Sequence, residues 1–144
     1  AARGRRDARA LGVRVVIRDG VLRILAAAVA VVPAASAMPP GDAARGEAIY
    51  SRCFACHSLD ANRTGPRHCG LLGRRAGSVP GFDYSPAMRA SGIVWDAKSL
   101  DRFLASPAAM VPGTSMGYAG IASAQERADL VAFLGAARCS GPRK

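Results

Sequence analysis

Two cysteines and a histidine form a compact cluster in the stretch RCFACHSLD, residues 52–60. Cys53 and Cys56 are separated by two residues, and His57 follows the second cysteine directly. Three kinds of site use such a cluster: a redox-active dithiol, a zinc site and a covalently attached haem. Each kind of site needs a different chain geometry around it, so the remaining sequence indicates which of the three is present.

The first 37 residues differ in composition from the remainder. An arginine-rich segment precedes the apolar run ILAAAVAVV, residues 24–32, which small residues at Ala35 and Ala37 follow. This order is typical of a secretory signal peptide, and nine apolar residues are too few for a membrane span, which takes roughly 20. We predict a signal-peptide region at residues 1–37 and one domain at residues 38–144, with no stable membrane span after cleavage; an uncleaved anchor is the alternative.

The net positive charge of the chain is divided equally between residues 1–37 and residues 38–144. Seven arginines against Asp7 and Asp19 give the leader half of the chain's net charge of +10. The other half lies on the mature domain and favours acidic partners in general. That domain has no basic stripe interleaved with aromatic residues, so we predict no binding to nucleic acid. Export would place its cysteines in an oxidising compartment, where disulfides persist.

Residues 38–144 contain helical patterns separated by loops rich in glycine and proline, without an alternating run long enough for a strand. This pattern predicts an all-α fold. A first helix is expected from an Asp42 cap to about Ala55, and shorter helices are expected after Ser85 and after Asp96.

The last helix has the clearest start, because Ser123 followed three residues later by Glu126 forms a capping box. Behind it, an apolar stripe at helical spacing comprises Leu130, Phe133, Leu134 and Ala137. The first helix offers Gly46 and Tyr50, one turn apart, as a partner surface. We expect the two helices to cross closely at Gly46.

Two loops without periodicity occupy residues 58–84 and 106–121. Loops this long are unusual in a small domain unless they surround something. The whole chain has only one Trp, three Tyr and four Phe, so a large apolar cofactor would help to form the core. These observations favour haem. A zinc site built from Cys53, Cys56, His68 and Cys69 remains an alternative, as does a dithiol, although the βαβ pattern usual for a dithiol is absent.

A haem iron needs a second axial position, and five side chains are candidates: Met38, Met88, Met110, Met116 and His68. Met116 is preferred because it lies in the irregular loop VPGTSMGYAG, where Pro112 and Gly113 can direct one thioether. Core packing is the expected role of Met88 and Met110.

The chain resembles the class I, mitochondrial-type cytochromes c, especially their proteobacterial forms. The resemblance covers about residues 41–138 and depends on motifs in family order: CFACH, TGPRHCGLLGRRAG, PGFDYSPAM, SGIVW, PGTSMGYAGI and ERADLVAFL. It implies helices and long loops wrapped around one covalently bound haem c. The cofactor-binding residues that it implies are Cys53, Cys56, His57, Pro66, Arg74, Tyr84, Trp95, Thr114 and Met116.

The resemblance also implies a role for each of these residues. Cys53 and Cys56 are the expected thioether anchors, and His57 and Met116 the expected iron ligands. The carbonyl of Pro66 is expected to accept a hydrogen bond from the proximal imidazole. The inner haem propionate is expected to contact Arg74, Tyr84 and Trp95, and Thr114 is expected near the other propionate.

The function that follows is one-electron transfer by a monohaem carrier in a periplasmic respiratory or photosynthetic-type chain, without a catalytic residue. Expected partners are an acidic-surfaced reductase and oxidase, and the expected state is a monomer. The alternatives are the haem subunit of a larger periplasmic dehydrogenase and, with a labile sixth ligand, a haem peroxidase-like enzyme.

The sequence departs from this family at several positions. Phe103 and Met88 stand where mitochondrial relatives have a tyrosine and an asparagine, which predicts a drier crevice. Around the ligand loop, Ala108, Ala109 and Ser115 replace docking lysines, and the remaining candidates for a positive rim are Arg52, Arg67, Arg74, Arg75 and Arg89. His68 replaces a leucine. The family architecture brings Cys69 near Cys139, which predicts a disulfide.

Overall fold

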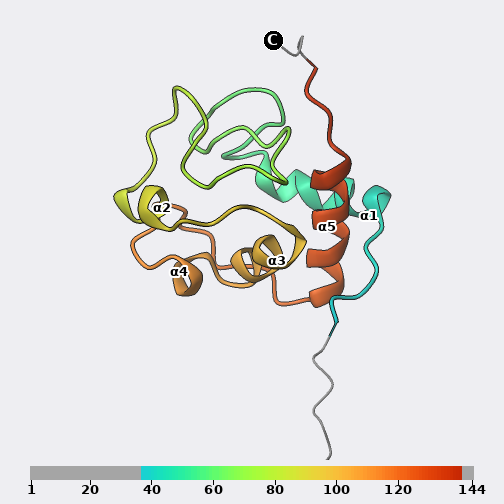
Figure 1. Ribbon diagram of the computed structural model, residues 1–144. Coiled ribbons are helices and arrows are strands. Elements are labelled where there is room, and N and C mark those ends of the chain that lie inside the picture. Colours follow the sequence, from blue (N-terminus) through green and yellow to red (C-terminus); the bar gives the residue numbers. More distant parts are fainter. Residues whose placement is uncertain (1–36, 141–144) are drawn as a thin grey trace, which may run out of the picture. The chain divides into compact units, whose positions relative to one another are not determined.

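The computed structural model describes residues 37–140, so nearly all of the predicted signal-peptide region lies outside the described residues. Five α-helices and one short 3₁₀ helix form this part of the chain (Figure 1): α1 Ala43–Tyr50, η1 Ser51–Cys53, α2 Pro86–Ala90, α3 Ala97–Ala105, α4 Pro107–Met110 and α5 Ala124–Ala136. Within residues 37–140 the β-structure is a single isolated bridge between Arg75 and Val94. The prediction of an all-α fold is confirmed. None of the helices described has the length and apolar character needed to cross a membrane.

Three of the helices begin where their capping residues predict. The Asp42 side chain accepts hydrogen bonds from the backbone at the start of α1, and Ser85 does the same for α2. The Asp96 carboxylate accepts from Ser99 N at 2.6 Å, while the Ser99 hydroxyl accepts from Asp96 N at 2.8 Å. This reciprocal pair is a capping box, and it fixes the start of α3.

At α5, the predicted capping box is only half formed. Ser123 Oγ accepts from Glu126 N at 3.2 Å, as expected. The Glu126 carboxylate does not return to the Ser123 backbone; it pairs in bidentate fashion with Arg52, at 2.8 and 2.9 Å. A charged partner from another segment has replaced the local backbone donor, because a bidentate guanidinium–carboxylate pair is stronger than one neutral hydrogen bond.

Two predicted boundaries are also wrong. The first helix was expected to reach about Ala55, but α1 ends at Tyr50 and continues as the tighter η1. Residues 106–121 were expected to be a loop, but they contain the four-residue helix α4, which has Pro107 at its first position. Proline lacks the backbone N–H that a first helical position leaves unused, so it favours this start.

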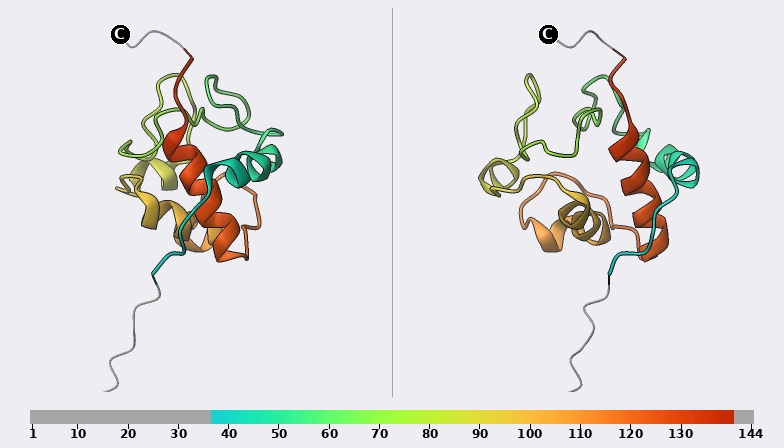
Figure 2. Two further views of the ribbon diagram at one scale, coloured as in Figure 1. Left: turned by 90° about the vertical axis from the view of Figure 1, so that its right-hand side faces the viewer. Right: turned by 45° about the vertical axis from the view of Figure 1, so that its right-hand side comes forward.

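α1 lies across α5 in the views of Figures 1 and 2. Gly46 is at the crossing, and a Cβ there would overlap the backbone carbonyl of Asp129. Next to it, Tyr50 and Leu130 are almost fully buried. The predicted close crossing at Gly46 is therefore confirmed, and it requires a residue without a side chain.

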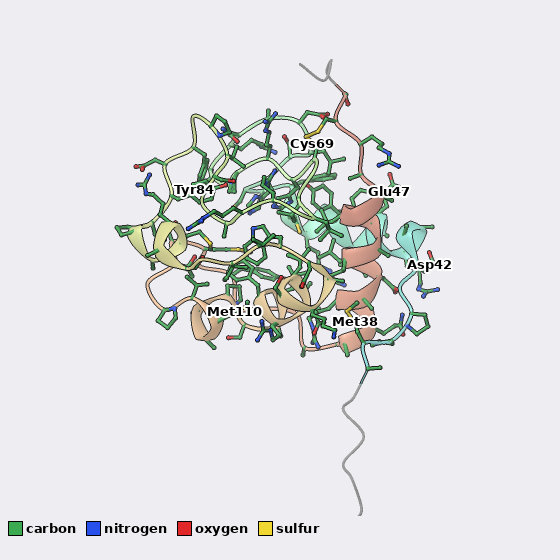
Figure 3. All side chains as sticks on the ribbon, in the orientation of Figure 1. Met38, Asp42, Glu47, Cys69, Tyr84 and Met110 are labelled. Carbon is green, nitrogen blue, oxygen red and sulfur yellow. A yellow bond between two sulfur atoms is a disulfide. The ribbon has the colours of Figure 1, made fainter. Side chains whose placement is uncertain are left out.

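The long loop before α2 is tied to the end of α5 at two points. A disulfide joins Cys69 to Cys139 (Figure 3). Beside it, the Asp60 carboxylate accepts hydrogen bonds from the backbone N–H and the hydroxyl of Ser140, each at 2.8 Å. These links hold the loop against the chain that follows α5.

Candidate haem site

A cavity of about 400 Å³ lies at the centre of the domain. It is lined by all nine residues that the sequence predicted to bind a cofactor: Cys53, Cys56, His57, Pro66, Arg74, Tyr84, Trp95, Thr114 and Met116. Sequence reasoning did not assign the apolar part of the lining, which includes Leu71, Leu100, Leu104, Ile121 and Leu134. The helical spacing of Leu100 and Leu104 in α3 indicated burial, but burial against a cofactor looks the same in a sequence as burial against other side chains.

A turn of backbone brings the two thiols and the imidazole to the cavity. The N–H groups of Cys56 and His57 both donate to the carbonyl of Cys53, at 3.1 and 2.8 Å. Cys53 is half-buried, Cys56 is exposed, and both carry free thiols. The two sulfur atoms are therefore available to form thioether bonds.

The dithiol and zinc alternatives fit this geometry poorly. Burial raises the pKa of the Cys53 thiol, whereas reactive dithiols depend on a lowered pKa. Cys69 cannot complete a zinc site, because its sulfur is bonded to Cys139. Within residues 37–140 no group of three or more His, Cys, Asp or Glu side chains is placed to hold a metal ion.

The His57 ring has a fixed tautomer. Its Nδ1 lies 2.8 Å from the carbonyl oxygen of Pro66, and a carbonyl can only accept, so Nδ1 carries the proton. Burial lowers the pKa of His57, and the hydrogen bond to Pro66 opposes that effect. The ring is thus neutral at neutral pH, and Nε2 keeps the lone pair that a metal ligand requires.

Met116 lies on the loop that follows α4. The turn is closed by a hydrogen bond from Thr114 N to Val111 O at 3.0 Å, and the Thr114 hydroxyl accepts from Met116 N at 3.3 Å. Gly113 adopts a φ of +86°, which a residue with a side chain rarely adopts. A hydrogen bond from Ile121 N to Leu104 O at 2.8 Å anchors the far end of the loop.

The other candidates for the second axial position are placed less well. Met88 lines the cavity but is part of the core, at 7% exposed. Met110, on α4 in Figure 3, packs against the core and does not line the cavity. His68 stacks on His57 with 4.1 Å between ring centroids, so it lies on the proximal side and cannot ligate from the opposite face.

Arg74 supplies a positive charge to the cavity wall. Its guanidinium donates to the backbone carbonyls of Cys69 at 3.1 Å and Arg67 at 2.8 Å, and it pairs with no carboxylate of residues 37–140. Burial lowers the pKa of Arg74 and raises that of Tyr84 nearby. A half-buried cation without an anionic partner is costly unless a negative group is bound beside it.

Together these groups have the chemistry that a haem requires. Free thiols match its vinyl groups, a neutral imidazole and a thioether match its iron, an unpaired guanidinium matches a propionate, and apolar walls match the porphyrin faces.

Comparisons with known proteins agree with this geometry. The family model described as Cytochrome c matches residues 43–137. Cytochrome c2 of Rhodomicrobium vannielii is 41% identical over 116 residues, which cover 78% of this chain and 93% of that protein. Cytochrome c2 of Blastochloris viridis is 39% identical over 126 residues, which cover 85% and 94%. Among solved structures, cytochrome cH from Methylobacterium extorquens superposes with a TM-score of 0.65 at 40% identity, covering 66% of this chain and 98% of that one.

Proposed function

This chain belongs to the cytochrome c family, and from that premise we propose that it carries single electrons between periplasmic redox proteins of a respiratory or photosynthetic-type chain. As a member of the family it binds one covalently attached haem c and acts as an electron carrier. The proposal assigns the thioether bonds to Cys53 and Cys56 and the axial positions to His57 and Met116. The observation that supports it best is that all nine sequence-predicted residues line one cavity.

The bound haem supplies an iron that changes between Fe(II) and Fe(III) without making or breaking a bond to substrate. The side chains that would hold this iron are themselves restrained by hydrogen bonds. Pro66 restrains the His57 imidazole at Nδ1 through the 2.8 Å hydrogen bond, and the Thr114 turn directs Met116. A site that changes little between oxidation states needs little rearrangement for each transfer.

Ligation by Met116 would also limit the reactions that the haem iron can take part in. A thioether favours Fe(II) over Fe(III) and raises the reduction potential. With His57 and Met116 both bound to it, the iron would have no position left for peroxide or another substrate. The chain therefore acts as an electron carrier and not as a haem enzyme.

The periplasmic location rests on two features of the chain. The signal-peptide pattern of residues 1–37 directs export. The Cys69–Cys139 disulfide is of a kind that persists in oxidising compartments. The partners are redox proteins, for which we propose an acidic docking surface, and the carrier acts as a monomer.

The axial ligands can be tested with the absorption spectrum of the oxidised protein, purified from a host that attaches haem. We expect colour that stays with the protein during acid–acetone extraction, together with the absorption band of a sulfur–Fe(III) bond. Met116→Leu should abolish that band and keep the covalent haem. Met110→Leu is the matched control, because Met110 does not line the cavity, and it should keep the band.

Three results would contradict the proposal. Persistence of the sulfur band in Met116→Leu would remove Met116 as the ligand. Absence of the band from the unmodified protein would favour a haem enzyme, and stable co-purification with a dehydrogenase would favour a subunit of a larger complex.

A further inference from the structure

His68 is stacked on the proximal imidazole. The rings of His57 and His68 have centroids 4.1 Å apart and planes inclined by 23°, and both residues line the cavity. The resemblance to class I cytochromes c implies a leucine at this position, which has no flat face to stack. The stack is therefore a feature of this chain that the shared motifs do not account for.

The His57 ring is held by three different contacts. The hydrogen bond from Nδ1 to Pro66 restrains one edge of the ring, but it makes no contact with either ring face. Gly65 lies so close that a Cβ there would overlap the ring at Cε1. The backbone of Gly65 and the ring of His68 both lie against the imidazole and limit how far its plane can tilt.

The backbone around His68 is itself held in place, so the His68 ring can restrain the imidazole that packs against it. Its backbone N–H donates to Ser58 O at 3.0 Å, and the next residue, Cys69, donates to Leu59 O at 2.8 Å. Cys69 is further fixed by its disulfide. On the two sides of His68, the Arg74 guanidinium binds the carbonyls of Arg67 and Cys69, so the segment cannot shift as a unit.

The packing around the His68 side chain restricts it in the same way. The ring of Tyr50, which is 1% exposed, lies 5.7 Å away at an inclination of 56°. Nδ1 of His68 is buried and has no hydrogen-bond partner in residues 37–140. A buried polar atom without a partner costs stability compared with an apolar side chain of similar shape, so the ring is not explained as the most stable filling of this space.

We propose that His68 is a positioning residue that sets the plane of the His57 imidazole by stacking on it. The inference rests on the proposed ligation of iron by His57. In the Fe(III) state, the plane of an axial imidazole helps to set which iron orbital holds the unpaired electron. His68 therefore controls how the unpaired spin is distributed over the haem, and with it the direction in which electronic coupling to a partner is strongest.

The test compares His68→Phe with His68→Leu in the oxidised haem-loaded protein. Phenylalanine keeps a flat ring at this position and removes the nitrogen atoms, whereas leucine removes the flat face. The measurement is the pattern of the strongly shifted haem methyl resonances in the proton NMR spectrum, which reports the plane of the axial ligand. We expect His68→Phe to keep the unmodified pattern and His68→Leu to change the order or spread of these resonances.

Either of two results overturns the proposal. If His68→Leu keeps the unmodified pattern, Pro66 and Gly65 fix the imidazole without His68. If His68→Phe shifts the resonances as much as His68→Leu does, the nitrogen atoms matter and the stacking does not. Should His68→Leu fail to fold, His68→Met supplies the variant without a ring.

The ligation on which the inference rests is checked separately in the same samples. The sulfur–Fe(III) absorption band and the shifted methyl resonance of an axial methionine must be present in each variant. Their absence from the unmodified protein contradicts the proposed function, whereas their presence with unchanged haem methyl shifts in His68→Leu contradicts only the role of His68. Tyr50→Phe is the control for indirect effects, because it leaves the His57–His68 stack in place, and it should keep the unmodified pattern.

Discussion

At the scale of single residues, Gly65 leaves no room for a side chain beside the His57 ring. A Cβ at position 65 would overlap Cε1 of His57 and lie 2.6 Å from both ring nitrogens. Gly65→Ala must therefore displace either the imidazole or the backbone that carries Pro66. We expect a loss of about 1–3 kcal/mol in the free energy of unfolding of the haem-loaded protein, which is typical of overpacking. Denaturant unfolding followed by haem absorbance measures it.

Gly135→Ala is the matched control for this substitution. A Cβ at position 135 meets only the side chain of Leu72, with Cδ1 at 2.9 Å, and Leu72 is exposed and able to turn away. Position 135 is inside α5, where alanine is favoured over glycine by up to about 1 kcal/mol. The same chemical change should thus leave stability unchanged or raise it. Equal losses in both variants would show that the contact with His57 is not the cause.

The role of a residue could be predicted from the sequence wherever a motif determines the geometry of a short segment. Cys53, Cys56 and His57 are brought together by one turn of backbone, and Pro66 follows closely enough for its carbonyl to reach the imidazole. The contact between His68 and His57 was not predictable in this way. It depends on how a long loop folds back, and no spacing along the sequence encodes that path.

At the scale of secondary-structure elements, one carboxylate ties α1 to α5. Asp129 on α5 accepts a hydrogen bond from Asp42 N at 2.7 Å, just before α1 begins. It also accepts from Arg45 Nε at 2.8 Å and Nη2 at 3.0 Å, and from Gln125 at 2.9 Å. The hydrogen bonds and the charge of Arg45 hold the pKa of Asp129 far below its ordinary value of 3.8.

This shift predicts a pH dependence of stability. Because the folded-state pKa of Asp129 is depressed, its contribution is fully present well above pH 3.8 and declines as the pH falls from there toward the folded value. Asp129→Asn should be less stable than the unmodified protein at neutral pH. The difference between the two should shrink steadily below about pH 4. Urea unfolding at a series of pH values measures both free energies.

The control for this prediction is Asp83→Asn. Asp83 also pairs with an arginine, Arg89, at 2.8 Å, but its side chain is 95% exposed. Exposed pairs contribute little, so this variant should follow the unmodified protein at every pH. A stability difference for Asp129→Asn that stays constant from pH 7 to about pH 2 would contradict the linkage to its titration.

The starts of elements were easier to predict than their ends and their partners. Asp42, Ser85 and Asp96 cap helices where expected, since a cap is a contact between near neighbours in the sequence. The pairing of Glu126 with Arg52 joins residues 74 positions apart, and a local pattern cannot indicate it. The short helix α4 was missed because four residues contain too little periodicity to distinguish a helical turn from a loop.

At the scale of the whole molecule, the Cys69–Cys139 disulfide closes a loop of about 70 residues around the cavity. In the chain-entropy model such a bridge stabilises the folded state by about 4 kcal/mol, because it restricts the unfolded chain. Cys139→Ser is the suitable variant, since Cys139 is exposed while Cys69 is buried. We expect it to lower the free energy of unfolding by up to that amount.

The iron and the disulfide must be reduced separately in this experiment. Ascorbate keeps the haem in the Fe(II) state and leaves disulfides intact, so all samples contain it. Adding a phosphine reductant should then destabilise the unmodified protein to the level of Cys139→Ser and leave the variant unchanged. An equal effect of the phosphine on both proteins would show that the bridge contributes nothing.

The distribution of surface charge is also a property of the whole molecule. The structure leaves fewer of the five candidate arginines available for a positive rim than the sequence suggested. Of the five candidate arginines, Arg52 is paired with Glu126 and Arg89 with Asp83, and Arg74 binds backbone carbonyls at the cavity. Arg67 and Arg75 are the members that remain without an ion pair among residues 37–140. Two of these five arginines are thus left without an ion pair or a contact at the cavity, which reduces the positive rim around the haem site.

We therefore expect the rate of electron transfer to an acidic oxidase to depend only weakly on ionic strength. Salt screens exposed charges beyond roughly 10 Å at 0.1 M, so the slope of rate against ionic strength reports how many charges steer the encounter. A variant with Ala108→Lys, Ala109→Lys and Ser115→Lys adds charges around the ligand loop and should show a faster rate at low salt and a steeper slope. Ala136→Lys, at the exposed end of α5, adds a charge away from that loop and should keep the shallow slope. Stopped-flow mixing with the reduced protein measures all three, and equal slopes would mean that charges near the ligand loop do not guide docking.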